Sequence, residues 1–268
     1  MNIIQSIILG AVQGMTEFLP VSSSGHLILV RDVLGMATDN GLAFDIMLHL
    51  ATLLAVVVAF RKIIIELALD LFRILRGQYR QVKKENRNLI LALIVGTIPV
   101  AVMGYLLEST IETTIREPRF VVGMLLIGSA LLIAGERYAK HQEDHISPKK
   151  GWWIGWFQVL ALLPGMSRSG ATISGAMILG IKRIQAAQFS FLLSVPIIAG
   201  SALKKGIDIA SGSVALPVPE LTAGFLTAFL VGWIVIHYFM KYLKNHTLYA
   251  FAVYRLLLAV LVLVLLKT

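Results

Sequence analysis

The chain has 268 residues, of which 57% are hydrophobic and only 15% are charged. Soluble domains carry about 25% charged residues, and apolar runs of about 20 residues recur along this chain, so the composition excludes a soluble protein and predicts a polytopic membrane protein. The absence of cysteine excludes disulfide and thiolate chemistry, and we attribute the net charge of +9 to cytoplasmic loops, so that no nucleic acid is expected as a partner.

Polar residues interrupt the first apolar segment, residues 1–35. This segment carries Glu17, Pro20, a serine cluster and His26. Neither residues 3–19 nor residues 25–35 make a comfortable span by themselves. Non-helical backbone inside a bilayer must be covered by protein or line a cavity. The pattern therefore predicts a re-entrant helix–loop–helix.

Three apolar runs follow, at residues 42–60, 89–107 and 119–136, and each is long enough to cross a bilayer. The first run carries Asp45 and His49 four residues apart, so both lie on one helix face. These two side chains could support a nearby site, form a metal-binding pair, or make an ordinary hydrogen bond between helices.

A charged segment, residues 61–88, holds eight Lys and Arg residues between the first two runs. Its apolar part, residues 63–75, either extends the preceding helix or lies at the membrane interface. Glu66 and Asp70 are expected to form a solvated stripe on that part.

The second half of the chain repeats the plan of the first. Sliding the sequence by 145 residues superposes identical residue types at several positions, among them Gln13 with Gln158, Ser22 with Ser167, Ser24 with Ser169, Gly25 with Gly170, Phe44 with Phe189 and Leu48 with Leu193. Residues 152–182 therefore form a second broken segment. Spans at residues 185–203, 220–240 and 248–266 follow, with a loop at 206–219 between the first two.

The predicted fold is an all-α polytopic membrane protein with one integral membrane domain, residues 1–268. It has six transmembrane helices and two re-entrant helix–loop–helix segments, in repeats at about 1–136 and 152–266. Because each repeat crosses three times, the second enters from the opposite side, which makes an inverted-topology repeat. Of the 24 Lys and Arg residues, 16 fall in loops on one side, which predicts that these loops are cytoplasmic and both termini outside.

The second break carries residues that suit a phosphate. An arginine at membrane depth costs about 2.5–3.5 kcal/mol, so Arg168 needs an anion, either Glu17 or a phosphate held in bidentate fashion. Hydroxyls and helix N-termini would add donors, unless the hydroxyls only cap helices. The candidate phosphate-binding residues are Gln13, Ser22, Ser24, Ser167, Ser169 and Thr172.

The first break carries the candidates for catalysis. Glu17 could hold Mg²⁺ or Ca²⁺, act as a base, or only pair with Arg168. His26 is a candidate base or nucleophile. Ser23, which superposes on Arg168 in the repeat, is a candidate for a specific role among the three serines. Arg255, near the cytoplasmic end of its span, is expected to snorkel to the interface.

These motifs resemble the undecaprenyl-diphosphate phosphatase family, also called bacitracin-resistance proteins, and the resemblance covers the whole chain in length and layout. The first family motif is present as Gln13, Glu17, Pro20, Ser22, Ser23, Gly25 and His26. The second is present as Pro164, Gly165, Ser167, Arg168, Ser169 and Thr172. Many members have Glu where this chain has Gln13, so carboxylate chemistry is lost at that position and hydrogen bonding is kept.

The resemblance implies hydrolysis of a C55 polyprenyl diphosphate to the monophosphate, which recycles the lipid carrier for cell-wall synthesis and gives bacitracin resistance. It implies a multi-pass protein of the bacterial cytoplasmic (inner) membrane whose site faces the outer side. The expected partners are this lipid and the membrane lipids around it. In this interpretation Arg168 binds phosphate oxygens, Glu17 holds the divalent ion or acts as base, and His26 is base or nucleophile.

Three matters stay open at this point. The nucleophile is Ser23, His26 or water. The alternative function is a transporter or flippase for an anionic lipid or solute, because inverted repeats with broken helices are the usual transporter plan. The sequence also leaves open whether the chain forms a homodimer.

Overall fold

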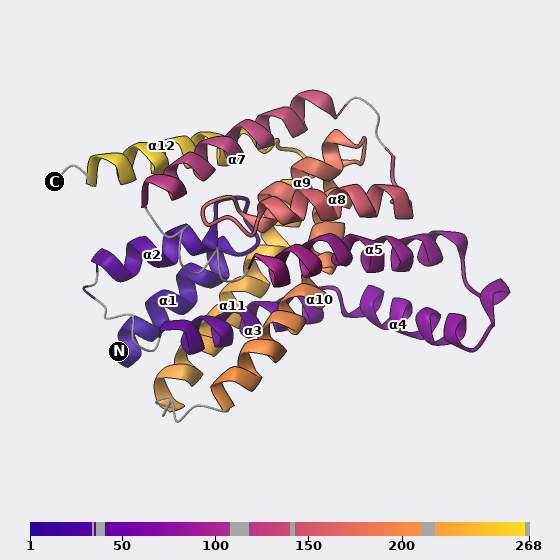
Figure 1. Cartoon of the computed structure of the whole chain (residues 1–268), viewed down its shortest axis with the longest axis horizontal. Helices are drawn as coiled ribbons and strands as arrows, with labels where there is room; N and C mark the ends of the chain where they lie inside the picture. The colour runs from indigo at the N-terminus through magenta and orange to yellow at the C-terminus, as the bar shows by residue number, and fades with distance from the viewer. Residues whose placement is uncertain (34, 36–40, 108–117, 140–142, 211–217, 266–268) are drawn as a thin grey trace.

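The protein is described here by a computed structural model that covers residues 1–33, 35, 41–107, 118–139, 143–210 and 218–265 (Figure 1). These residues form α-helices and one short 3-10 helix. The helices are α1 (Ile3–Thr16), α2 (Ser23–Val33), α3 (Gly41–Ala59), α4 (Arg61–Leu75), η1 (Tyr79–Gln81), α5 (Lys84–Leu106), α7 (Pro118–Tyr138), α8 (Pro148–Leu160), α9 (Arg168–Ile178), α10 (Arg183–Ala210), α11 (Val218–Tyr242) and α12 (Tyr249–Leu265). The predicted all-helical architecture is confirmed.

Both broken segments are present as two short helices joined by a turn. The helices α1 and α2 flank the first turn, and α8 and α9 flank the second. Ser22 has φ of 75° and Ser167 has φ of 72°, the left-handed region that non-glycine residues seldom adopt. These two serines are 145 residues apart, the same offset that superposes the two halves of the sequence. The repeat therefore extends to the backbone conformation of the breaks.

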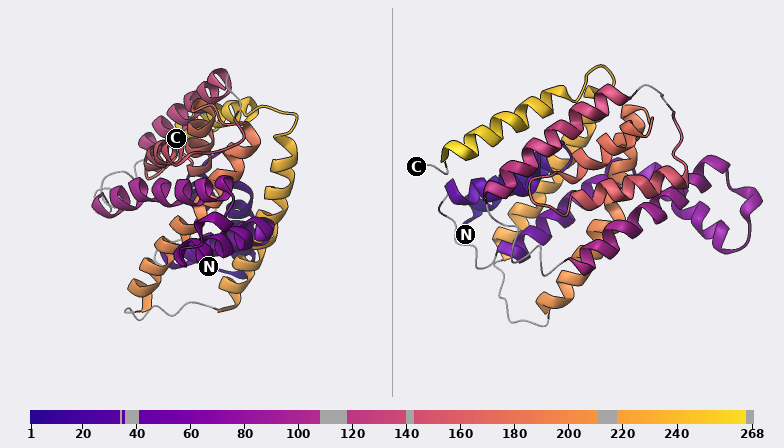
Figure 2. Two further views of the ribbon diagram at one scale, coloured as in Figure 1. Left: turned by 90° about the vertical axis from the view of Figure 1, so that its right-hand side faces the viewer. Right: turned by 45° about the horizontal axis from the view of Figure 1, so that its top comes forward.

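The two halves of the chain are interlocked. Helix α1 packs along α11, whereas α8 packs along α5 (Figures 1 and 2). A Cβ on Gly10 would overlap the carbonyl oxygen of Gly224, and a Cβ on Gly155 would overlap that of Gly96. Small residues let helix backbones approach closely in membranes. Because Gly10 and Gly155 are also 145 residues apart, each broken segment is held against the opposite half by an equivalent glycine.

Helix α4 turns away from α3 by 84° and forms a hairpin with α5 that projects from the rest of the molecule (Figure 1). It therefore does not continue the α3 direction. Asp70 on α4 is only 3% exposed, and it accepts hydrogen bonds from Asn86 Nδ2 at 2.7 Å and Arg73 Nη1 at 2.7 Å. The expectation of a solvated stripe was wrong for Asp70, because the charged segment folds back on itself and buries this carboxylate between α4 and α5.

Four helices of the described chain are long and apolar enough to cross a membrane, and a fifth is added if α3 and α4 form one broken span. The four are α5, α7, α10 and α11, and α12 is shorter. Several apolar crossings are therefore present, and the count of six with two re-entrant segments stays a prediction. Helix α10 runs to Ala210, so the loop expected from residue 206 begins later; residues 211–217 lie outside the described chain, as do 108–117.

Candidate active site

Glu17, at the C-terminal end of α1, is the centre of a buried polar cluster. Its Oε1 accepts a hydrogen bond from Arg168 Nη2 at 2.7 Å. Its Oε2 accepts hydrogen bonds from Ser23 Oγ at 2.8 Å and from Gln13 Nε2 at 3.0 Å. Only 6% of the Glu17 side chain is exposed, and burial of a carboxylate is costly unless it is paired and hydrogen-bonded. This cluster joins the two breaks, as the sequence predicted.

Arg168 is the first residue of α9 and carries the positive charge of the cluster. Besides Glu17, it donates from Nη1 to the carbonyl oxygen of Ser190 at 3.4 Å. The Ser190 hydroxyl lies 2.6 Å from Thr172 Oγ1, and Thr172 is fully buried. Helix α10 therefore forms the wall behind the guanidinium, and Ser190 is a neighbour that the sequence analysis did not find.

The serines of both breaks cap the helices that follow them. Ser22 Oγ accepts from the Gly25 amide at 3.4 Å, and Ser167 Oγ accepts from the Gly170 amide at 3.2 Å. Ser169 Oγ donates to the carbonyl oxygen of Leu19 at 3.0 Å, which ties the second break to the first. Ser24 is the exposed member of its cluster. The capping alternative therefore describes Ser22 and Ser167 here, and their contact with phosphate stays a prediction.

His49 of α3, rather than His26, is the imidazole beside Glu17. Its Nδ1 lies 3.0 Å from Gln13 Nε2 and 3.6 Å from Glu17 Oε2, and its side chain is 40% exposed. Asp45, one turn earlier, instead forms a two-point ion pair with Arg31 of α2. Of the three alternatives for Asp45 and His49, hydrogen bonds between helices describe both residues here, and each takes a different partner.

The described hydrogen bonds of His26, on α2, go to partners other than Glu17. Its Nδ1 lies 2.7 Å from the carbonyl oxygen of Ser22, and its Nε2 lies 2.6 Å from the hydroxyl oxygen of Tyr254 on α12. The structure therefore places the candidate base at the edge of the cluster, next to a residue that the sequence analysis did not single out.

Arg255 holds the two breaks together from the side of α12. Its side chain is completely buried, so the expectation that it snorkels to the interface was wrong. Within the described chain the guanidinium donates to backbone oxygens, namely those of Pro20 (3.3 Å), Met124 (3.1 Å), Leu125 (3.3 Å), Gly165 (3.0 Å) and Met166 (2.9 Å). Backbone at a broken helix has free carbonyls that need donors. Arg255 supplies hydrogen-bond donors to both breaks and to α7.

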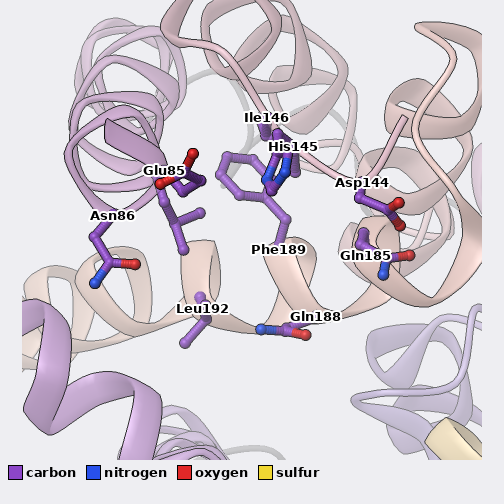
Figure 3. A pocket seen from close by; sticks show the side chains of 10 residues that line it. Glu85, Asn86, Asp144, His145, Ile146, Gln185, Gln188, Phe189 and Leu192 are labelled. Carbon is purple, nitrogen blue, oxygen red and sulfur yellow. The ribbon is translucent and has the colours of Figure 1, made fainter. Parts of the chain in front are cut away.

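A cavity of about 190 Å³ lies between α5, α10 and the segment before α8 (Figure 3). Glu85, His145 and Gln188 are among its lining residues. Ser190 stands between Gln188 and Leu192 on α10, and residues two apart on a helix do not share a face. This cavity is therefore separated from the Glu17 cluster by α10.

The donors around Glu17 suit a divalent ion only in part. Among the described residues, no group of three or more His, Cys, Asp or Glu side chains could hold a metal. Gln13 is fully buried, and its Oε1 has no hydrogen-bond partner among the residues that the structure describes. Glu17 and Gln13 therefore offer oxygen ligands, which Mg²⁺ and Ca²⁺ prefer, while the remaining ligands would have to come from phosphate and water.

The sequence matches a family described as "Bacitracin resistance protein BacA" over residues 6–261. The chain belongs to this family. It is 40% identical over 264 residues to an undecaprenyl-diphosphatase of Elusimicrobium minutum, with 98% of each chain covered. It is 42% identical over 269 residues to one of Rubrobacter xylanophilus (98% of this chain, 97% of the relative) and 41% over 262 residues to one of Idiomarina loihiensis (97% of each).

Family membership and the apolar helices together identify a multi-pass membrane protein. The family predicted from the two motifs is confirmed. In this chain the two motifs meet at the cluster of Glu17, Ser23 and Arg168.

Proposed function

We propose that this protein hydrolyses the phosphoric anhydride of undecaprenyl diphosphate to undecaprenyl phosphate and inorganic phosphate. This reaction recycles the lipid carrier for cell-wall synthesis and gives bacitracin resistance. The observation that carries the proposal is the 2.7 Å ion pair between Glu17 and Arg168, which brings both family motifs into one cluster in a chain whose relatives are named undecaprenyl-diphosphatase. A transporter or flippase is not favoured, because carrying an anion requires Arg168 but neither the acid, Glu17, nor the imidazole of His49 beside it.

In the proposed reaction the Arg168 guanidinium releases the Glu17 carboxylate and binds the terminal phosphate of the substrate. The guanidinium is a forked donor that matches phosphate oxygens, and phosphoryl transfer depends mainly on positioning and charge stabilisation. The freed Glu17 carboxylate then accepts a proton from Ser23 or from a water in its place. The 2.8 Å hydrogen bond from Ser23 Oγ to Glu17 Oε2 already has this donor–acceptor direction.

A divalent ion, Mg²⁺ or Ca²⁺, is proposed to bind together with the diphosphate. The positive charge of Arg168 opposes a cation at Glu17 while the ion pair is intact. Phosphate drawn to the guanidinium would release Glu17 and bring oxygen ligands of its own. The free Gln13 Oε1 supports this arrangement as a second protein ligand. The ion would supply charge neutralisation at the transferred phosphate.

The finer topology is part of the proposal. It comprises six transmembrane helices and two re-entrant segments in an inverted repeat, in the cytoplasmic membrane, with the site open to the outer side. The equivalent turns at Ser22 and Ser167 and the distribution of Lys and Arg support it.

The proposed function is tested by measuring phosphate release from undecaprenyl diphosphate with purified protein in detergent, where no compartments exist and transport has no signal. We expect release in the presence of Mg²⁺ or Ca²⁺. Folded protein that releases no phosphate with either ion would overturn the proposal.

A further inference from the structure

Tyr254 of α12 contacts the His26 ring from a position 228 residues later in the chain. Its hydroxyl oxygen is 2.6 Å from His26 Nε2. The two rings are nearly parallel, at 7°, with centroids 5.7 Å apart. Tyr254 is 44% exposed, so it lies at the open edge of the site. The rings therefore meet edge to edge through this hydrogen bond, which holds the imidazole in one orientation.

The hydrogen-bond partners of His26 determine which nitrogen carries its proton. The carbonyl oxygen of Ser22 can only accept, so His26 Nδ1, 2.7 Å away, must be the donor. In a neutral imidazole the other nitrogen is then an acceptor, and the Tyr254 hydroxyl must donate to Nε2. If Nε2 is protonated, the phenol can reverse and accept from it, because a hydroxyl is both donor and acceptor.

The charged side chains near His26, those of Arg255 and Glu17, have other partners and do not bond to its ring. The guanidinium of Arg255, the next residue of α12, is occupied by backbone oxygens of both breaks. Glu17, on α1, is occupied by Ser23 and Arg168. The described hydrogen bonds of the His26 ring therefore come from Ser22 and Tyr254, one on each nitrogen.

We propose that Tyr254 is a positioning residue of the hydrolytic site. Its hydroxyl fixes the orientation of the His26 ring, in which the Ser22 carbonyl leaves Nε2 as the nitrogen that takes up a proton. This inference rests on the proposed function and adds to it that His26 takes up a proton during turnover, but the state of the imidazole can be measured independently of turnover.

The test uses the full-length protein in detergent with ¹⁵N-labelled histidine, and a His26→Gln variant assigns the His26 signals among the six histidines. The unsubstituted protein should show protonated Nδ1 and an Nε2 that accepts a hydrogen bond. In Tyr254→Phe, which keeps the aromatic ring and removes only the hydroxyl, the Nε2 signal should move to the position of an unbonded nitrogen. The kcat should fall about tenfold with KM unchanged, the loss expected for one hydrogen bond of about 1.4 kcal/mol.

Tyr238→Phe is the matched control. Tyr238 on α11 packs edge-on against His237, with ring centroids 5.5 Å apart, and is 64% exposed. It should change neither the His26 signals nor kcat.

Protonated Nε2 and bare Nδ1 in the unsubstituted protein at neutral pH would overturn the proposal, and this spectrum decides even if Tyr254→Phe does not fold. An unmoved Nε2 signal or an unchanged kcat in Tyr254→Phe would also overturn it. Absence of phosphate release from the unsubstituted protein would refute the proposed function instead and leave the NMR result standing.

Discussion

The ion pair between Glu17 and Arg168 stabilises the fold, and its arginine is proposed to bind phosphate. Substitution can separate these two roles. In Arg168→Gln, the Glu17 carboxylate stays buried, with 6% of its side chain exposed, and loses its cation. Breaking a buried pair on one side costs about 3–5 kcal/mol, whereas replacing both partners is often close to neutral. Arg168→Gln should therefore lower the free energy of unfolding by about 3 kcal/mol, and the double substitution with Glu17→Gln should recover most of this loss.

Turnover should behave differently from stability. An arginine that stabilises phosphoryl transfer contributes on the order of 10³-fold in rate, so both Arg168→Gln and the double variant should lose phosphate release by at least about that factor. Stability is read from unfolding in detergent and turnover from phosphate release on the same samples. Recovery of activity together with stability in the double variant would refute the phosphate-binding role of Arg168. Parental stability in Arg168→Gln would refute the buried ion pair.

Three further predictions concern the scaffold and the ion. Arg255→Met should lower the free energy of unfolding by at least about 3 kcal/mol, because it leaves buried carbonyls without donors. Arg255→Lys should recover only part of this loss, since an ammonium has fewer donors than a guanidinium. Equal free energies of unfolding for the parent and both variants would contradict this. Gly155→Ala should lower the free energy of unfolding, because a Cβ there would overlap α5. Gly123→Ala should not, because a Cβ at Gly123 would meet nothing within 4 Å. Equal effects of the two substitutions would show that close packing at Gly155 is unimportant. Glu17→Gln should weaken diphosphate-dependent Mn²⁺ binding measured by electron paramagnetic resonance, and unchanged binding would remove Glu17 as a ligand.

The breaks and their meeting could be predicted because their signals are local. A carboxylate and an arginine cannot remain single in apolar segments, so each required a partner, and the offset of 145 residues related the two segments. The structure pairs Glu17 with Arg168 and gives Ser22 and Ser167 the same unusual backbone conformation. The pairing follows from the cost of buried charge rather than from any contact visible in the sequence.

Arg255 was misjudged and Tyr254 was missed because their environment depends on how helices rotate and pack. The position of Arg255 in its helix suits snorkelling, but α12 lies along α7 and turns this residue inward against both breaks. The spacing of Asp45 and His49 suggested a pair, yet the orientation of α3 sends one to Arg31 and the other to Gln13. A tyrosine followed by an arginine within the last apolar run was the available signal for the α12 contribution.

The most direct test of the central claim is turnover of undecaprenyl diphosphate by the purified protein in water enriched in ¹⁸O. Hydrolysis at the terminal phosphate predicts ¹⁸O in the released inorganic phosphate and none in the undecaprenyl phosphate, as read by mass spectrometry. Label in the lipid monophosphate, or no conversion by folded protein supplied with Mg²⁺ or Ca²⁺, would contradict the account.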